Sequence, residues 1–189
     1  PFLFYMAGTV AWGYFATCLT LTSNTFVSNK DIFGKVYFPR LTVPIANVII
    51  ALLQFLIQFV IFLLFLGFYI WQGLNLNIGI SILYLPLIVI QMAILSLGVG
   101  IFISSLTAKY RDLTFAMTFL VQIWMYATPV VYPLSIIPEK YRIFAVLNPM
   151  TSIVESFRGV LLGTTSIQLI HIIVSITITI IIFILGIIL

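Results

Sequence analysis

Few side chains of this chain could carry acid–base or ion-coupling chemistry, and the clearest are Glu155 and Arg158. They stand three residues apart, so on a helix they share one face and can form an ion pair. At membrane depth the pair must face protein or water, because a charge that faces lipid is costly. At the membrane surface it could instead extend into the headgroups, and both placements stay open. The single histidine, His171, stands near the start of an apolar run, where an interfacial role is commoner than a catalytic one.

Other catalytic and coupling arrangements are missing from the sequence. A phosphate-binding loop needs G-x-x-x-x-G-K-[ST], and the nearest stretch, residues 159–166, lacks the lysine. Ion-coupled carriers need carboxylates inside their spans, and the long apolar runs contain no such pair. The single cysteine, Cys18, and the single histidine exclude an internal disulfide and a His- or Cys-based metal cluster. These residues indicate a conduit that a bound partner must drive.

The composition places this conduit in a bilayer. Of the 189 residues, 63% are hydrophobic and 6% are charged, and the mean hydropathy is +1.29. A typical soluble domain has about 25% charged residues. The net charge of +4 comes from eight Lys and Arg residues against four Asp and Glu residues, too few for a nucleic-acid-binding surface.

Four stretches lack Asp, Glu, Lys and Arg, namely residues 1–29, 41–108, 113–138 and 159–189. A membrane-crossing helix needs about 20 apolar residues, so the second stretch must fold back, and its polar break at residues 72–77 predicts the turn. We therefore predict an all-α, polytopic membrane helical bundle that forms a single permease domain. Its five predicted spans cover residues 3–28, 42–71, 79–106, 114–132 and 166–189.

The charged loops predict the orientation of these spans. The loops at residues 30–40 and 109–112 carry five basic residues, and the opposite side carries three between residues 139 and 158. The more basic side is expected to be cytoplasmic, which puts Pro1 outside and Leu189 inside. An upstream helix is then expected to be missing, and the parent protein is expected to have six spans.

Residues 133–165 are too polar and too rich in proline for a span, yet too apolar for a free loop. Pro138 and Asn148-Pro149 delimit one short helix, Ser152–Glu155 matches a capping box that would open a second, and Gly163 suits its end. Each piece has about ten residues, roughly 15 Å, which is half the membrane thickness. We predict a re-entrant helical hairpin over residues 136–163; two amphipathic helices lying on the interface are the alternative.

Four motifs resemble those of ABC-2 type permeases that export polysaccharides. They are Lys-Val-Tyr-Phe-Pro-Arg at residues 35–40, Lys-Tyr-Arg-Asp-Leu at 109–113, Gln-Ile-Trp-Met-Tyr-Ala-Thr-Pro-Val-Val-Tyr-Pro at 122–133, and Asn-Pro-Met followed by Glu-Ser-Phe-Arg-Gly within 148–159. Their order and spacing match over almost the entire chain, which is similar to membrane subunits of O-antigen, capsule and teichoic-acid exporters. Those members have an N-terminal interfacial helix and six spans, so the resemblance implies that this helix and the first span are missing here.

The resemblance implies a homodimeric permease in the bacterial cytoplasmic (inner) membrane that is not itself an enzyme. Two nucleotide-binding ATPase subunits would bind ATP and Mg, while this chain would hold no cofactor. Their ATP hydrolysis would move a lipid-linked glycan to the outer side.

Aromatic residues are the candidates for contact with that glycan, since flat rings can stack on sugars and still let a polymer slide. Trp124, Tyr126 and Tyr132 stand near the outer end of the fourth predicted span, and Tyr14 and Phe15 stand within the first. The resemblance implies that they line the translocation channel. The alternative is an aromatic belt that anchors the helices at the membrane interface.

The basic loops supply the remaining candidates. Arg40 and Lys35 are predicted to form a cytoplasmic gate or to contact the pyrophosphate of a lipid-linked substrate, because a guanidinium suits that anion. Plain positive-inside topology is the alternative. The predicted ATPase-facing residues are Lys30, Asp31, Lys109, Tyr110, Arg111 and Asp112.

Two other functions remain open on the sequence. An ABC-2 permease for a small lipid or drug would have a narrower channel with fewer aromatic residues. A membrane-bound glycolipid-modifying enzyme would require a carboxylate or a histidine that faces a cleft, and the sequence offers little to fill that role.

Overall fold

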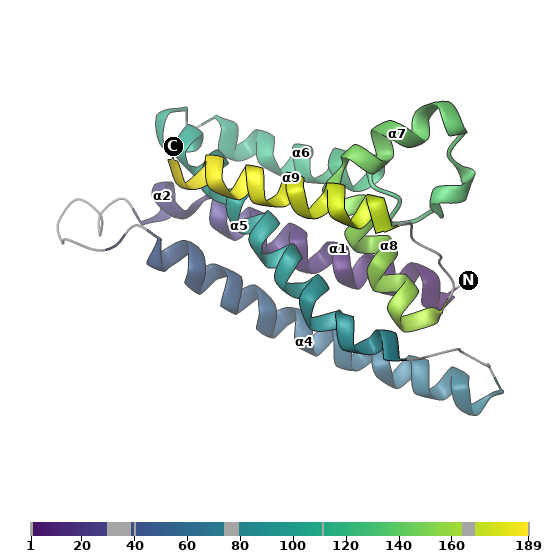
Figure 1. Ribbon diagram of the computed structural model, residues 1–189. Coiled ribbons are helices and arrows are strands. Elements are labelled where there is room, and N and C mark those ends of the chain that lie inside the picture. Colours follow the sequence, from purple (N-terminus) through teal and green to yellow (C-terminus); the bar gives the residue numbers. More distant parts are fainter. Residues whose placement is uncertain are drawn as a thin grey trace.

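The computed structural model describes residues 2–29, 39, 41–73, 80–110, 112–163 and 169–188, and in these residues it contains helices and turns but no strand. In chain order the elements are α1 (Phe2–Ser23), α2 (Thr25–Ser28), α4 (Thr42–Trp71), the 3₁₀ turn η1 (Ile80–Tyr84), α5 (Leu85–Lys109), α6 (Leu113–Ala127), the 3₁₀ turn η2 (Leu134–Ile136), α7 (Glu139–Leu147), α8 (Pro149–Leu162) and α9 (Leu169–Ile188) (Figure 1). The all-α fold expected from the sequence is confirmed for this part of the chain.

Four helical segments of the described residues are long and apolar enough to cross a membrane. They are Phe2–Ser23, Thr42–Trp71, Ser81–Lys109 and Leu169–Ile188. The span predicted over residues 114–132 corresponds to α6, whose 15 residues measure about 22 Å, less than the roughly 30 Å of a hydrocarbon core. A total of five spans stays a prediction.

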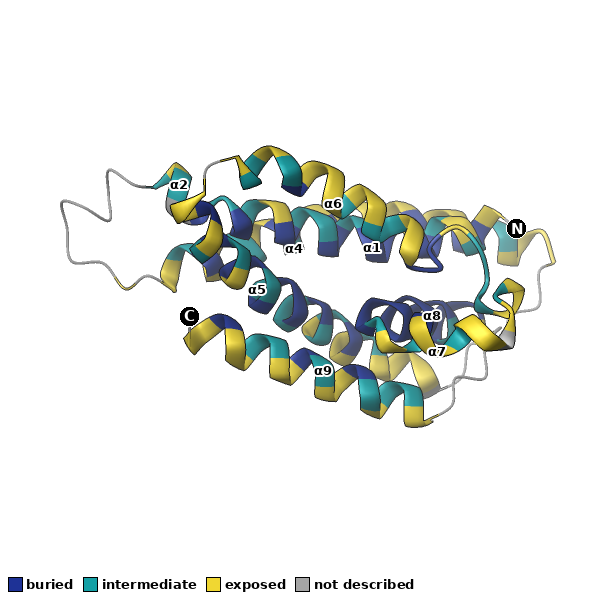
Figure 2. Cartoon of the chain, turned by 90° about the horizontal axis from the view of Figure 1, so that it is seen from above, coloured by how far each residue is buried: buried dark blue, intermediate teal, exposed yellow. Residues whose placement is uncertain are grey.

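The helix α1 forms the centre of the bundle and packs against α4, α5, α6 and α8. The helix α5 lies beside α1 and carries α9 on another side. Figure 2 shows that α8 is largely buried, whereas α9 alternates buried and exposed residues along its length. Many of the exposed residues of α4 and α9 are isoleucine, leucine and phenylalanine, as a surface that faces lipid requires.

Gly98 and Gly186 bring the backbones of α5 and α9 into contact. A Cβ added to Gly98 would lie 2.7 Å from the Cα of Phe183, and one added to Gly186 would meet the backbone of Gly98. In lipid, small residues at a helix crossing permit the close packing that holds helices together. The contact therefore depends on the absence of both side chains.

Replacing Gly98 by valine is expected to separate α5 from α9 and to lower the melting temperature of the purified protein by several degrees, because overpacking costs about 1–3 kcal/mol. Thermal unfolding in detergent measures the effect. Gly67→Val on α4 is the matched control, since an added Cβ there meets nothing within 4 Å. Equal melting temperatures for the two variants would contradict the close contact.

The short helices α7 and α8 meet at Asn148. Its Oδ1 accepts a hydrogen bond from the backbone N of Met150 at 3.2 Å, and Pro149 occupies the first turn of α8. The capping box predicted at Ser152 is therefore wrong: Asn148 caps the helix one turn earlier, and the Ser152 hydroxyl instead donates to the His171 carbonyl at 3.2 Å. The predicted end at Gly163 is confirmed by its left-handed φ of 64°.

Candidate functional site

The ion pair between Glu155 and Arg158 lies inside the protein. Arg158 is 0% exposed and Glu155 is 5% exposed, and Nη1 of the arginine lies 3.3 Å from Oε1 of the glutamate. The same Nη1 donates to the carbonyl of Pro129 at 2.7 Å, Nη2 donates to the carbonyl of Val130, and Nε donates to the carbonyl of Phe4 at 3.2 Å. The guanidinium thus joins α8 to the start of α1 and to the turn that follows α6.

The packing around the guanidinium leaves no room for a further group. The Cζ of Arg158 lies 3.8 Å from the centre of the Phe4 ring, a cation–π contact. A Cβ added to Gly8 would lie 3.0 Å from that Cζ and 2.5 Å from the carbonyl oxygen of Val130. Because each guanidinium nitrogen donates to a partner and the side chain is fully buried, Arg158 fixes the arrangement of these segments.

A cavity that we name the aromatic cleft lies between the end of α6 and the helix α7. Its volume is about 580 Å³. The residues that line it are Trp124, Ala127, Tyr132, Ile137, Tyr141, Phe144, Ala145, Asn148 and Pro149. Four of these are aromatic, so the cleft presents several flat apolar faces around one space.

A small hydrogen-bond network fixes the Trp124 wall of the aromatic cleft. Trp124 donates through Nε1 to Oδ1 of Asn148 at 3.1 Å, and Nδ2 of Asn148 donates to the Thr128 hydroxyl at 2.8 Å. That hydroxyl donates to the Trp124 carbonyl at 2.9 Å. Behind the indole, Phe15 packs edge-to-face with a centroid distance of 5.1 Å. The polar tip and the ring face of Trp124 are therefore both held in place.

The structure separates the five predicted channel residues. Trp124 and Tyr132 line the aromatic cleft, whereas Tyr126 is 69% exposed outside it and its carbonyl accepts a hydrogen bond from the Tyr132 hydroxyl at 2.9 Å. Tyr14 and Phe15 are buried in the core of this chain. Tyr14 packs on Phe55, and Phe15 supports Trp124 from behind.

Sequence reasoning missed two aromatic residues of the cleft, Tyr141 and Phe144. Both belong to α7, three residues apart on one face, and more than half of each side chain is exposed. This spacing within the amphipathic stretch 139–147 was the available signal.

The residues predicted to face an ATPase are only partly described. Lys109 ends α5, and its Nζ lies 5.4 Å from the centre of the Tyr110 ring. The carbonyl of Asp112 begins α6 by accepting from the backbone N of Phe115 at 3.2 Å. Lys30, Asp31 and Arg111 lie outside the described residues. So do Lys35 and Arg40, the predicted gate or phosphate contact.

Hydrogen bonds place the start of this loop region at the same end of the bundle as α2. The Thr107 hydroxyl of α5 donates to the Ser23 carbonyl at 3.0 Å. Asn47 of α4 donates through Nδ2 to the Leu21 carbonyl at 3.0 Å and to the Thr25 hydroxyl at 3.2 Å. Within the described residues no group of three or more His, Cys, Asp and Glu side chains could hold a metal ion.

Comparison with known proteins gives a consistent picture. The ABC-2 type transporter family matches residues 2–162. An O-antigen export system permease protein, RfbA of Klebsiella pneumoniae, is 31% identical over 163 residues, which cover 86% of this chain and 61% of that protein. RfbA of Myxococcus xanthus is 26% identical over 162 residues, covering 85% of this chain and 60% of that protein. The chain thus spans about three fifths of the length of these curated relatives.

Proposed function

This chain belongs to the ABC-2 type transporter family, and we propose that it is the membrane subunit of an ATP-driven exporter for a lipid-linked, O-antigen-like polysaccharide. The observation that carries the proposal is its 31% identity, over 86% of the chain, to an O-antigen export permease. Family membership and the apolar helices make it a multi-pass protein of the cytoplasmic (inner) membrane and a transporter subunit.

The proposed topology has five spans in this chain, with α6 as the short fourth span and α7–α8 as a re-entrant hairpin. The burial of α8 against α1, α5 and α9 supports the hairpin, because a helix lying on the membrane surface would expose one face to water. The turn after α6 and its contact with Arg158 extend this segment beyond the 15 helical residues.

The aromatic cleft is the proposed sugar-contacting part of the pathway. Rings can stack on the apolar faces of sugars without fixing the polymer at one register, as aromatic platforms do for successive bases. Trp124, Tyr132, Tyr141 and Phe144 line the cleft, and Tyr126 would contact the polymer from outside it. Phe15 acts through Trp124, and Tyr14 through its packing on Phe55.

The proposed assembly contains two copies of this chain and two ATPase subunits, which bind ATP and Mg. The loops at residues 30–40 and 109–112 would face the ATPases. Arg40 and Lys35 would meet the pyrophosphate of the lipid-linked glycan through charge-assisted hydrogen bonds.

Co-purification with an ATPase, followed by ATP hydrolysis in the presence of a lipid-linked glycan, tests the proposal. We expect the glycan to stimulate hydrolysis in reconstituted proteoliposomes and to accumulate on the opposite side. An ATPase partner whose phosphate-loop lysine is replaced is the control, and it should abolish both signals. Movement or modification of the glycan by the permease alone would overturn the proposal.

A further inference from the structure

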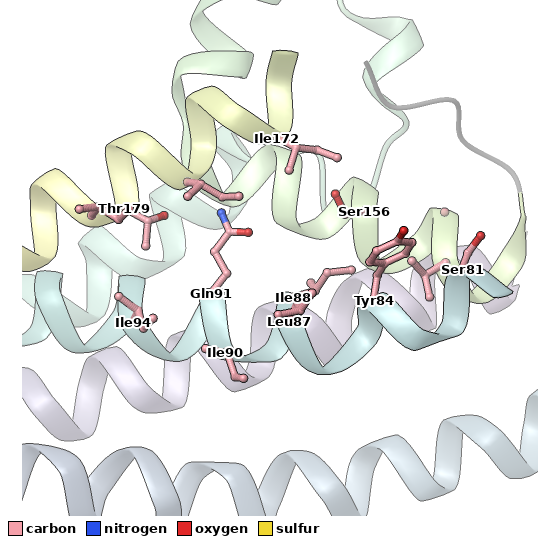
Figure 3. A pocket seen from close by; sticks show the side chains of 14 residues that line it. Ser81, Tyr84, Leu87, Ile88, Ile90, Gln91, Ile94, Ser156, Ile172 and Thr179 are labelled. Carbon is pink, nitrogen blue, oxygen red and sulfur yellow. The ribbon is translucent and has the colours of Figure 1, made fainter. Parts of the chain in front are cut away.

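A second cavity, which we name the α5–α9 groove, runs between α5, α8 and α9 and has a volume of about 540 Å³. Figure 3 shows side chains that line it, among them Leu87, Ile90 and Ile94 of α5 and Ile172 of α9. Leu87 and Ile90 are more than half exposed, so the groove opens on the outside of the bundle. It lies within two segments long and apolar enough to cross a membrane, where the surrounding solvent is hydrocarbon.

The groove is mainly apolar, and its polar side chains differ in whether they already have hydrogen-bond partners: Thr179, at the end near Ile94, donates to the Ser175 carbonyl at 2.8 Å, and Gln91 donates to the Ser175 hydroxyl at 2.8 Å. The hydroxyl groups of Ser81, Tyr84 and Ser156 gather at the end where α5 begins, whereas Ile94 lies toward the opposite end (Figure 3). None of these three hydroxyls donates a hydrogen bond to another described residue, so they remain available to a ligand. Hydroxyls without a partner among the described residues thus gather at one end only, which matches a molecule with a polar head and one hydrocarbon chain.

The groove is long enough to cross the hydrocarbon part of one leaflet and to reach its polar boundary. From Ser81 to Ile94 it follows η1 and α5 for about 20 Å at 1.5 Å per residue, and half of a hydrocarbon core measures about 15 Å. Between these ends, Gln91 of α5 donates through Nε2 to the Ser175 hydroxyl of α9 at 2.8 Å. This hydrogen bond fixes the spacing of the two walls, so the groove is formed before a ligand enters.

We propose that the α5–α9 groove binds one acyl chain of a membrane glycerophospholipid, with its ester region at Ser81, Tyr84 and Ser156. Hydroxyl donors suit ester carbonyl acceptors. A diphosphate-linked carrier would require cations, and none of the described residues that line the groove is charged. The start of α5 lies at the opposite end of the helix from residues 109–112, which are proposed to face the ATPases, so the bound lipid belongs to the outer leaflet. The groove is therefore a structural lipid site separate from the glycan pathway.

Photolabelling in a bilayer tests this site. The protein with its ATPase is reconstituted into nanodiscs of phosphatidylethanolamine and phosphatidylglycerol that contain a phosphatidylethanolamine probe with a diazirine on the terminal carbon of its acyl chain. We expect label to concentrate near Ile94 and Ile180 and to exceed that on the exposed face of α4. Uniform labelling of α4, α5 and α9 would overturn the proposal.

A variant whose larger side chains fill the groove tests the site more directly. The double variant Ile176→Trp and Ile180→Trp is expected to lower label near Ile94 severalfold, because the two indoles fill the groove and exclude the acyl chain from contact with its walls. The matched control, Ile57→Trp with Ile61→Trp, places the same residues four apart on the exposed face of α4 and should leave the label unchanged. Equal labelling of both variants would contradict the site.

Two further experiments test the hydroxyl groups at the polar end of the groove and the chemical class of the bound lipid. Tyr84→Phe combined with Ser156→Ala is expected to reduce probe retention severalfold while the melting temperature stays unchanged; unaltered retention would refute the assigned polar end. A diazirine-bearing polyprenyl diphosphate that labels Ile94 more strongly than the phospholipid would overturn the ligand class. None of these experiments measures glycan transport. A negative result for the lipid site would therefore leave the proposed export function untouched, and the reverse also holds.

Discussion

Replacing Arg158 by leucine is expected to prevent stable accumulation of the protein in the membrane. The substitution removes the partner of Glu155, which is 5% exposed, and leaves the Phe4, Pro129 and Val130 carbonyls without their shared donor. Breaking a buried ion pair by removing one partner typically costs about 3–5 kcal/mol, a large part of the 5–15 kcal/mol that holds a typical protein folded. Membrane-fraction immunoblotting and thermal unfolding in detergent measure the loss.

A second arginine supplies the control for this variant. Arg142 lies on α7, and its Nε has no hydrogen-bond partner among the described residues, so Arg142→Leu is expected to leave accumulation nearly unchanged. The double variant Glu155→Leu with Arg158→Leu should recover part of the stability, because it removes the uncompensated carboxylate as well. Equal melting temperatures for Arg158→Leu and Arg142→Leu would contradict the role given to the guanidinium.

Replacing both Tyr141 and Phe144 by alanine is expected to reduce polysaccharide export by at least about tenfold while the protein still accumulates. Both side chains line the aromatic cleft and are more than half exposed, so their loss leaves the core intact. Aromatic stacking contributes about 1–3 kcal/mol per ring in single-stranded nucleic-acid binding, and about 1.4 kcal/mol corresponds to a factor of ten. Surface glycan and glycan-stimulated ATP hydrolysis are the measurements.

The controls separate ring loss from damage to α7. Ile143→Ala removes a large exposed side chain between the two rings that does not line the cleft, and export should persist. The exchange Tyr141→Phe with Phe144→Tyr keeps both rings and should retain most activity. Full export by the double alanine variant would remove α7 from the pathway.

The long apolar runs specified the helical class of the fold, because uncharged segments of this length can cross lipid only as helices or barrels. The uncharged run at residues 113–138 shows that such runs do not fix where a helix ends. The sequence carries no charge until Glu139, and the expected span continued to residue 132, yet α6 ends at Ala127. Proline at position 129 disfavours helical backbone at Thr128, and Arg158 binds the carbonyls of the turn that follows.

Most of the structural features that could not be predicted from the sequence depend on contacts between residues far apart in the chain. The spacing of Glu155 and Arg158 predicts that they share a helix face, but it does not predict the carbonyl of Phe4, 154 positions away. The sequence predicts that the second short helix opens at Ser152, but the cap formed by Asn148 starts α8 at Pro149. The types of Tyr14 and Phe15 do not distinguish a channel wall from a packed core, because aromatic rings serve both.

Asn148 connects three helices, because it follows the last residue of α7, caps the start of α8 and accepts a hydrogen bond from Trp124 of α6. We expect Asn148 to anchor this end of α7, which also contacts α8 and α9. A movement of α7 about Asn148 would change the width of the aromatic cleft between Tyr141 and Tyr132 while Trp124 keeps its hydrogen bond to Asn148. Under the proposed function, such a movement would make room for a bulky or branched sugar unit while the indole keeps its hydrogen bond to Asn148.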